Sequence, residues 1–153
     1  MVQDVLSPPR TRLVTGEELA RMPNMGRSEL VEGRLVMLSP TGLEHGDVEL
    51  SIGEAIKRFV RERKLGRAGS GEVGLYTRRD PDTVRGADVM FMSHERLAKL
   101  GDSAFLDVAP ELIVEVLSPD DRWSEVRQKL REYFEIGVAL VAFGGSLVWR
   151  AVG

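Results

Sequence analysis

Two acidic residues and one lysine stand in this sequence where apolar neighbours predict burial. Glu115 lies within the apolar segment 111–117, and the alternation of a strand places it on one face with Ile113 and Leu117. An ionised glutamate buried without a partner costs several kcal/mol. Glu115 therefore needs a cation, a metal ion, a hydrogen-bond network or an opening to a cleft. An internal salt bridge to an arginine would satisfy the same need, and the sequence leaves both explanations open.

Asp88 and Lys129 occupy comparable positions. Asp88 stands where the apolar part of segment 85–91 begins, and Lys129 shares a helical stripe with Val126 and Tyr133. Each has an ordinary structural explanation, as a strand-edge aspartate and as a lysine whose stem packs while its head reaches water. Together with Glu115 they could form a site of hard oxygen ligands for Mg²⁺ or Mn²⁺, with a cation to offset developing negative charge. We therefore predict that these three residues are catalytic.

The elements that must position these residues follow from periodicity and capping signals. Helices are expected over 15–22, 41–66, 93–101 and 122–136, and strands over 28–31, 34–38, 67–77, 84–92, 111–117, 138–143 and 147–152. Thr41 and Glu44 have the spacing of a capping box at the start of the longest helix. The apolar stripes of the two longest helices, which include Phe59 and Phe134, are expected to face inward. This order predicts an α/β (α+β) fold with helices against a central sheet.

Length and composition indicate one globular domain. The 153 residues fit a single core, with a flexible N-terminal arm over 1–12 and the domain over 13–153. Hydrophobic residues make up 42% and charged residues 29%, and no apolar run approaches the ~20 residues of a membrane span. There is no cysteine and no secretory signal pattern at the start. We expect a cytoplasmic protein with no membrane partner.

The net charge of −3 would not attract a polyanion to the molecule as a whole. A nucleic-acid enzyme of this composition must use local basic patches, and candidates are Lys57, Arg58, Arg61, Arg63, Lys64, Arg67, Arg78 and Arg79. Charged helix ends and turns are also common in proteins that bind no nucleic acid.

Five stretches of the chain carry a family resemblance. They are ELVEGRLVMLSP (29–40), the helix containing His45, RGADVMFM (85–92), PELIVEVLSPDDR (110–122) and KLREYFEIGV (129–138). In this combination and order they resemble the Uma family of putative restriction endonucleases, a branch of the PD-(D/E)xK nuclease superfamily. The resemblance covers almost the whole chain from Ser28 and implies a restriction-endonuclease-like central mixed β-sheet flanked by helices.

The resemblance assigns roles to particular residues. Asp88 matches the motif aspartate and Glu115 the motif acid. The lysine of the superfamily normally follows that acid by two positions, where this chain has Leu117, so Lys129 on the next helix is the candidate for a migrated lysine. Ala87 stands where the family usually has proline.

The implied metal ligands are Asp88, Glu115 and the backbone carbonyl of Val116, with His45 as a further candidate. His45 could equally be a hydrogen-bonded core histidine. Supplementary carboxylates could come from three other acids that are equally explained as exposed turn and helix residues, namely Glu32, Glu44 and Glu49.

The resemblance implies a Mg²⁺- or Mn²⁺-dependent endonuclease that hydrolyses phosphodiester bonds of nucleic acid, with DNA favoured. Lys129 would orient the attacking water or offset charge on the phosphorus. Two alternatives remain open: a catalytically silent binding or assembly module on the same scaffold, and a phosphoesterase of small substrates. The segment 139–153 is shorter than the family's usual ending. An open sheet edge there would favour a homodimer.

Overall fold

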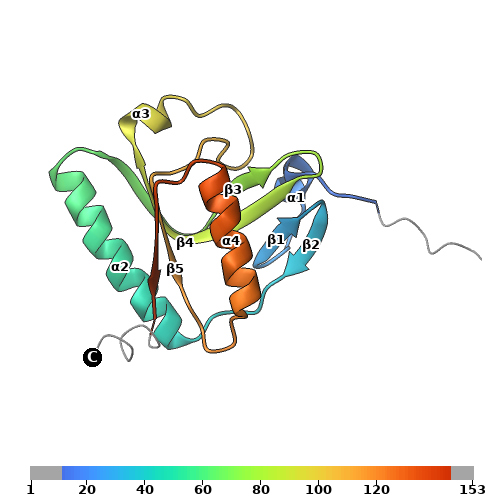
Figure 1. The fold of residues 1–153 in the computed structure, drawn as a ribbon, viewed down its shortest axis with the longest axis horizontal. Helices are drawn as coiled ribbons and strands as arrows, with labels where there is room; N and C mark the ends of the chain where they lie inside the picture. Colours follow the sequence, from blue (N-terminus) through green and yellow to red (C-terminus); the bar gives the residue numbers. More distant parts are fainter. Residues whose placement is uncertain (1–11, 146–153) are drawn as a thin grey trace, which may run out of the picture.

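The computed structural model describes residues 12–145 (Figure 1). Its elements are α1 (Gly16–Arg21), β1 (Ser28–Val31), β2 (Arg34–Met37), α2 (Leu43–Glu62), β3 (Gly66–Arg78), β4 (Thr83–Ser93), α3 (His94–Leu97), β5 (Leu112–Val116), α4 (Trp123–Glu135) and β6 (Leu140–Gly144). The predicted arm and the predicted strand over 147–152 fall outside the described residues, apart from Arg12.

The sheet is organised around β4. Strand β3 pairs antiparallel with β4 along its length, whereas β1 and β5 both pair with the opposite edge of β4. On that edge Leu30 of β1 lies opposite Val84, and β5 pairs with the segment 89–91. The hairpin partner β2 extends the sheet at one end, and β6 extends it at the other through parallel pairing with β5. The predicted mixed sheet with flanking helices is confirmed.

Local sequence signals explain several element ends. Thr15 and Glu18 form the capping box that starts α1. The turn between β1 and β2 uses Glu32 and Gly33, both with positive φ, as the tight turn requires. The capping box predicted at Thr41 is wrong. Helix α2 has Gly42 as its N-cap, without a side-chain hydrogen bond to the first turn.

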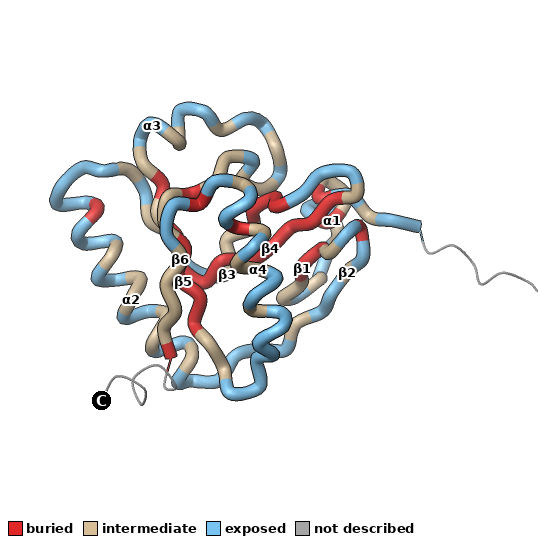
Figure 2. The backbone as a smooth tube through the Cα atoms, viewed as in Figure 1, coloured by how far each residue is buried: buried red, intermediate tan, exposed pale blue. Residues whose placement is uncertain are grey.

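The core lies along the central strands rather than along the helices (Figure 2). Met92, Ile113 and Tyr133 are buried together in the larger cluster. Phe59 and Phe134, predicted to face inward, are 49% and 51% exposed. Adjacent helical residues point about 100° apart, so burying Tyr133 turns Phe134 away from the sheet.

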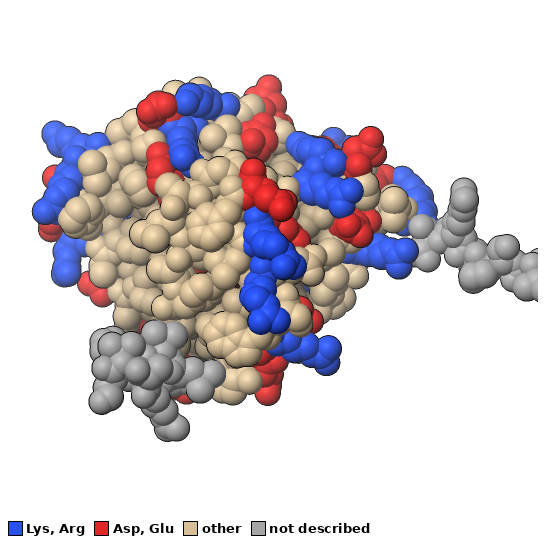
Figure 3. Space-filling view, in the orientation of Figure 1, with Lys and Arg blue, Asp and Glu red and all other residues tan. Residues whose placement is uncertain are grey.

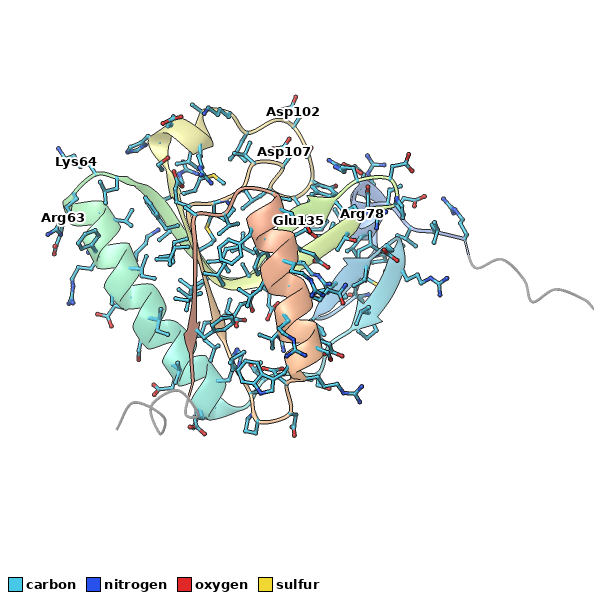
Figure 4. The ribbon with its side chains drawn as sticks, viewed as in Figure 1. Arg63, Lys64, Arg78, Asp102, Asp107 and Glu135 are labelled. Carbon is cyan, nitrogen blue, oxygen red and sulfur yellow. The ribbon has the colours of Figure 1, made fainter. Side chains whose placement is uncertain are left out.

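The two longest helices run in the same general direction. The ends of α2 and α4 marked by Arg63 and Glu135 both lie toward the upper part of Figure 4, so both helices begin at the lower end of the sheet. Within residues 12–145 no helix has the length and apolarity needed to cross a membrane.

Candidate active site

The candidate site lies where β1 and β5 diverge along the shared edge of β4. Between Val84 and Val89 this edge carries no ladder pair among the described residues. Carboxylate side chains bind backbone amides there instead: Glu29 Oε1 accepts from the Gly86 N–H at 3.0 Å, and Asp88 Oδ2 accepts from the Val116 N–H at 2.7 Å. The buried acids therefore complete the sheet where strand pairing is interrupted.

Asp88 and Glu115 belong to neighbouring antiparallel strands and share this gap. Asp88 is 4% exposed and Glu115 is 9% exposed. The ladder runs through Val89 opposite Val114, so the next pair in register is Asp88 with Glu115. Two carboxylates side by side repel one another, which favours either a proton or a cation between them.

Glu115 contacts α4 through two residues one helical turn apart. The Tyr133 hydroxyl donates to Glu115 Oε1 at 2.6 Å, and Lys129 Nζ lies 3.7 Å from Glu115 Oε2. Burial raises the pKa of Glu115 to about 7. The positive charge of Lys129 and the Tyr133 hydrogen bond lower this pKa, and repulsion from Asp88 raises it. The protonation state of Glu115 thus changes near neutral pH.

Lys129 makes its shorter contact with Glu29 of β1. Its Nζ atom lies 2.9 Å from Glu29 Oε1. Burial works against the charged amine, but the carboxylates of Glu115 and Glu29 outweigh burial and raise the pKa of Lys129. The lysine therefore stays protonated at neutral pH, as a residue that stabilises negative charge requires.

Arg85 ties this cluster to the body of α4. It donates to Glu29 Oε2 at 2.9 Å and forms a two-point ion pair with Glu132, at 2.6 and 2.7 Å. Burial opposes the ionisation of Glu29, yet Lys129 and Arg85 lower its pKa. Glu29, Arg85 and Glu132 were not predicted as site residues from the sequence. Glu29 and Arg85 could have been found by the signal that identified Glu115, a charged residue within an apolar strand.

Glu72 enters the site through a β-bulge in β3. The register with β4 shifts between Ser70 and Val73, and both Gly71 and Glu72 have positive φ. The Glu72 carboxylate forms an ion pair with Arg27. Burial raises its pKa, with Arg27 opposing and Asp88 adding to the shift.

His45 and Glu49, one turn apart on α2, lie close to Asp88. His45 Nε2 lies 3.6 Å from Asp88 Oδ1 and 3.8 Å from Glu49 Oε2, and one donor atom of each of these residues lies within 4.8 Å of the others. The opposite ring nitrogen, Nδ1, is 3.3 Å from Ser118 Oγ. The Nε2 atom is buried without a hydrogen-bond partner among the described residues. An unbonded imidazole nitrogen with two carboxylates nearby has the chemistry of a divalent-metal site.

Most of these residues line a cavity of about 750 Å³, whereas Glu49 and Glu132 do not. Its walls include all the predicted site residues, Asp88, Glu115, Lys129, Val116 and His45, together with Glu29, Glu72 and Arg85. The N-cap residues of α2 and α4, Gly42 and Arg122, also line it. The Lys129 side chain, which is 24% exposed, connects this ion-pair cluster to solvent.

The three predicted supplementary carboxylates lie in different surroundings. Glu32 is exposed and pairs with Arg78, away from the cavity. Glu44 is exposed but lines the cavity, and Glu49 belongs to the histidine cluster.

The two predicted basic patches lie apart, with Arg63 and Lys64 at the C-terminal end of α2 and Arg78 on the opposite side of the molecule (Figure 4). Lys and Arg side chains gather over the C-terminal end of α2 and along α4, with acidic side chains between them (Figure 3). At the turn before β4, Arg79 pairs with Glu17, as Arg78 does with Glu32. The exposed loop that carries Asp102 and Asp107 lies at the other end of the molecule from the starts of α2 and α4 (Figure 4).

Comparison with known proteins finds a family and a solved structure that are similar to this chain. The model of the family Uma2, described as "Putative restriction endonuclease", matches residues 16–143. Among solved structures, the crystal structure of a "putative nuclease belonging to DUF820" from Anabaena variabilis superposes with a TM-score of 0.70 at 18% sequence identity. The match covers 86% of this chain and 74% of that one. A comparison with curated proteins finds no match.

Proposed function

Because the chain belongs to the Uma2 family of restriction-endonuclease type, we propose that it is a metal-dependent endonuclease that hydrolyses phosphodiester bonds of nucleic acid. DNA is the expected substrate and Mg²⁺ or Mn²⁺ the expected cofactor. One observation carries the proposal: Asp88, Glu115 and Lys129, from two strands and the following helix, line one cavity.

The donor set supports a divalent cation. In this proposal Asp88 serves two groups of ligands. One is formed with Glu115 and the Val116 carbonyl, from residues that line the same cavity, and the other with His45 and Glu49, whose donor atoms lie close to an Asp88 oxygen. The buried Nε2 atom of His45 has no hydrogen-bond partner among residues 12–145, so an ion there would satisfy it. Hard carboxylate oxygens suit Mg²⁺ and Mn²⁺, and the imidazole favours Mn²⁺ of the two.

In the proposed reaction the cation and the protein side chains have separate roles. A bound divalent cation would supply Lewis-acid activation of phosphate and of water. Asp88 and Glu115 would hold the cation, and Lys129 would stabilise negative charge that develops on the phosphoryl oxygens. Tyr133 fixes the orientation of Glu115 through its 2.6 Å hydrogen bond.

The walls of the cavity support an anionic substrate. Helices α2 and α4 both begin there, and neither N-cap residue bonds the first turn through its side chain. The N-terminus of a helix attracts phosphate through its free amides and dipole. Arg122 adds a cation at the start of α4.

Cleavage assays test this function. Purified protein should cut DNA in the presence of Mg²⁺ or Mn²⁺ and not in the presence of a chelator. Asp88→Asn, Glu115→Gln and Lys129→Met should each lower the rate by a factor on the order of 100 or more, because each removes a group that acts on the charged centre. Asp102→Asn, on the distant exposed loop, is the matched control and should keep the wild-type rate.

The outcomes separate the proposal from its alternatives. Cleavage that persists at the wild-type rate in all three site variants would refute the assignment. A wild-type protein that neither binds metal nor cuts DNA or RNA would be a silent binding module. Turnover of short model esters without cleavage of nucleic acid would instead identify a small-substrate phosphoesterase.

A homodimer joined through β6 belongs to the same proposal. Among the described residues β6 pairs only with β5, and Leu140 on it is 60% exposed. An apolar strand edge of this kind favours pairing with a second copy. The molar mass from light scattering decides between one chain and two.

A further inference from the structure

The ammonium group of Lys129 is held by Glu29 rather than by the proposed catalytic acid. Its Nζ atom lies 2.9 Å from Glu29 Oε1, a hydrogen-bonding distance, and 3.7 Å from Glu115 Oε2, which is beyond that range. A lysine side chain has four flexible torsions, so its amine takes a defined place only where a partner fixes it. That partner belongs to β1, far from α4 in sequence.

Glu29 is itself fixed by three contacts. Oε1 accepts from the Gly86 N–H at 3.0 Å and from Lys129, and Oε2 accepts from Arg85 at 2.9 Å. The residue is 3% exposed. A carboxylate with both oxygens so occupied cannot turn to bind a metal ion without losing these partners. It would therefore keep its place, and the place of the lysine, when Glu115 turns to a cation.

We propose that Glu29 is a positioning residue that anchors the Lys129 ammonium beside Glu115 and so aligns it for the reaction. This inference rests on the proposed function for its catalytic meaning. Glu29 does not touch the reacting atoms and acts only through Lys129. Arg85 contacts Glu29 on one side and Glu132 on the other.

A purely structural role for Glu29 is the competing explanation, because its Gly86 contact also joins β1 to β4. Glu132→Gln is the matched control, since Glu132 shares Arg85 with Glu29 but contacts its other side. Both variants, Glu29→Gln and Glu132→Gln, weaken an ion pair of Arg85 and keep the length of the side chain. Only Glu29→Gln removes the negative charge that holds Lys129.

Steady-state cleavage kinetics give the first readout, at a temperature where circular dichroism shows both variants folded. Glu29→Gln should lower kcat roughly tenfold or more and change KM little, as for partners that orient an active group. Glu132→Gln should keep kcat within a few-fold of wild type. Equal kcat for Glu29→Gln and wild type, or equal losses in the two variants, would overturn the proposal.

Unfolding equilibria give a second readout that needs no catalysis. Glu29→Gln and Lys129→Met, combined in a double-mutant cycle, should show a coupling of about fivefold or more in the unfolding constant. Additive effects would overturn the inference. If the wild type cuts nothing, the proposed function fails, and the coupling still decides whether Glu29 holds the lysine.

Discussion

Glu115 has to lose a proton before it can bind a cation, and its burial makes that proton titrate near pH 7. In the unfolded chain the same carboxyl titrates near 4.5. Between these values the folded protein binds more protons than the unfolded chain. The contribution of Glu115 to stability is therefore full below pH 4.5 and is lost as the pH rises through 7.

We accordingly predict that the metal-free protein loses stability from about pH 5 to pH 8. The loss should amount to a few kcal/mol at most, since one pKa unit corresponds to about 1.4 kcal/mol. Urea unfolding at a series of pH values measures it. Glu115→Gln, which cannot titrate, should flatten this slope. An unchanged slope in that variant would assign the titration to other groups, of which Glu72, with its raised pKa, is the first candidate.

At this scale the sequence revealed the residues with unusual surroundings but not their partners. Glu115 and Lys129 stood out because each carries a charge on a predicted inner face. The contact between Lys129 and Glu29 depends on where β1 meets β4, which is a tertiary relation with no local signal. Whether Asp88, Glu115 and Lys129 are catalytic stays a prediction.

Helix α4 brings two side chains to one acid, since Lys129 and Tyr133 are one turn apart and both face Glu115. Tyr133 is fully buried, so its hydroxyl depends on this contact. Tyr133→Phe should lower stability by about 1 kcal/mol, the usual value of one hydrogen bond. It should also raise the pKa of Glu115 further and weaken Mn²⁺ binding at neutral pH, which isothermal titration calorimetry measures.

Phe134→Leu is the control for that variant. Phe134 is the next residue on the same helix but is half exposed and points away from the sheet. It should leave Mn²⁺ affinity unchanged. An equal loss of affinity in both variants would mean that α4 as a whole, rather than the tyrosine hydroxyl, had been disturbed.

Element types were predictable because hydrophobic periodicity is local, and the observed bounds of β4, β5 and α4 lie within a residue or two of those predicted. The start of α2 was mispredicted because Thr41 and Glu44 have the right spacing, yet Gly42 takes the N-cap position. The bulge at Gly71 and Glu72 also escaped prediction. A bulge arises from the register of two strands, which sequence periodicity does not encode.

On the scale of the whole molecule, metal binding should appear as added stability, because the folded chain alone assembles the ligands. An ion at 100 times its Kd adds about 2.7 kcal/mol. We predict that Mn²⁺ raises the Tm of the wild type in a concentration-dependent way, measured by differential scanning calorimetry.

Variants in that assay locate the ion. Asp88→Asn should abolish the Tm response, since Asp88 belongs to both ligand groups. His45→Ala and Glu49→Gln should abolish it if the ion binds on the α2 side, whereas Glu115→Gln should abolish it if the ion binds on the β5 side. A full response in Asp88→Asn would exclude both positions.

The interrupted edge of β4 gives two of the buried acids a structural task of their own. Asp88 and Glu29 bind the amides of Val116 and Gly86, and so serve as substitutes for missing strand partners. A relative without catalytic activity would still gain stability from both acids. Their retention in another protein would therefore be poor proof that it is an active enzyme.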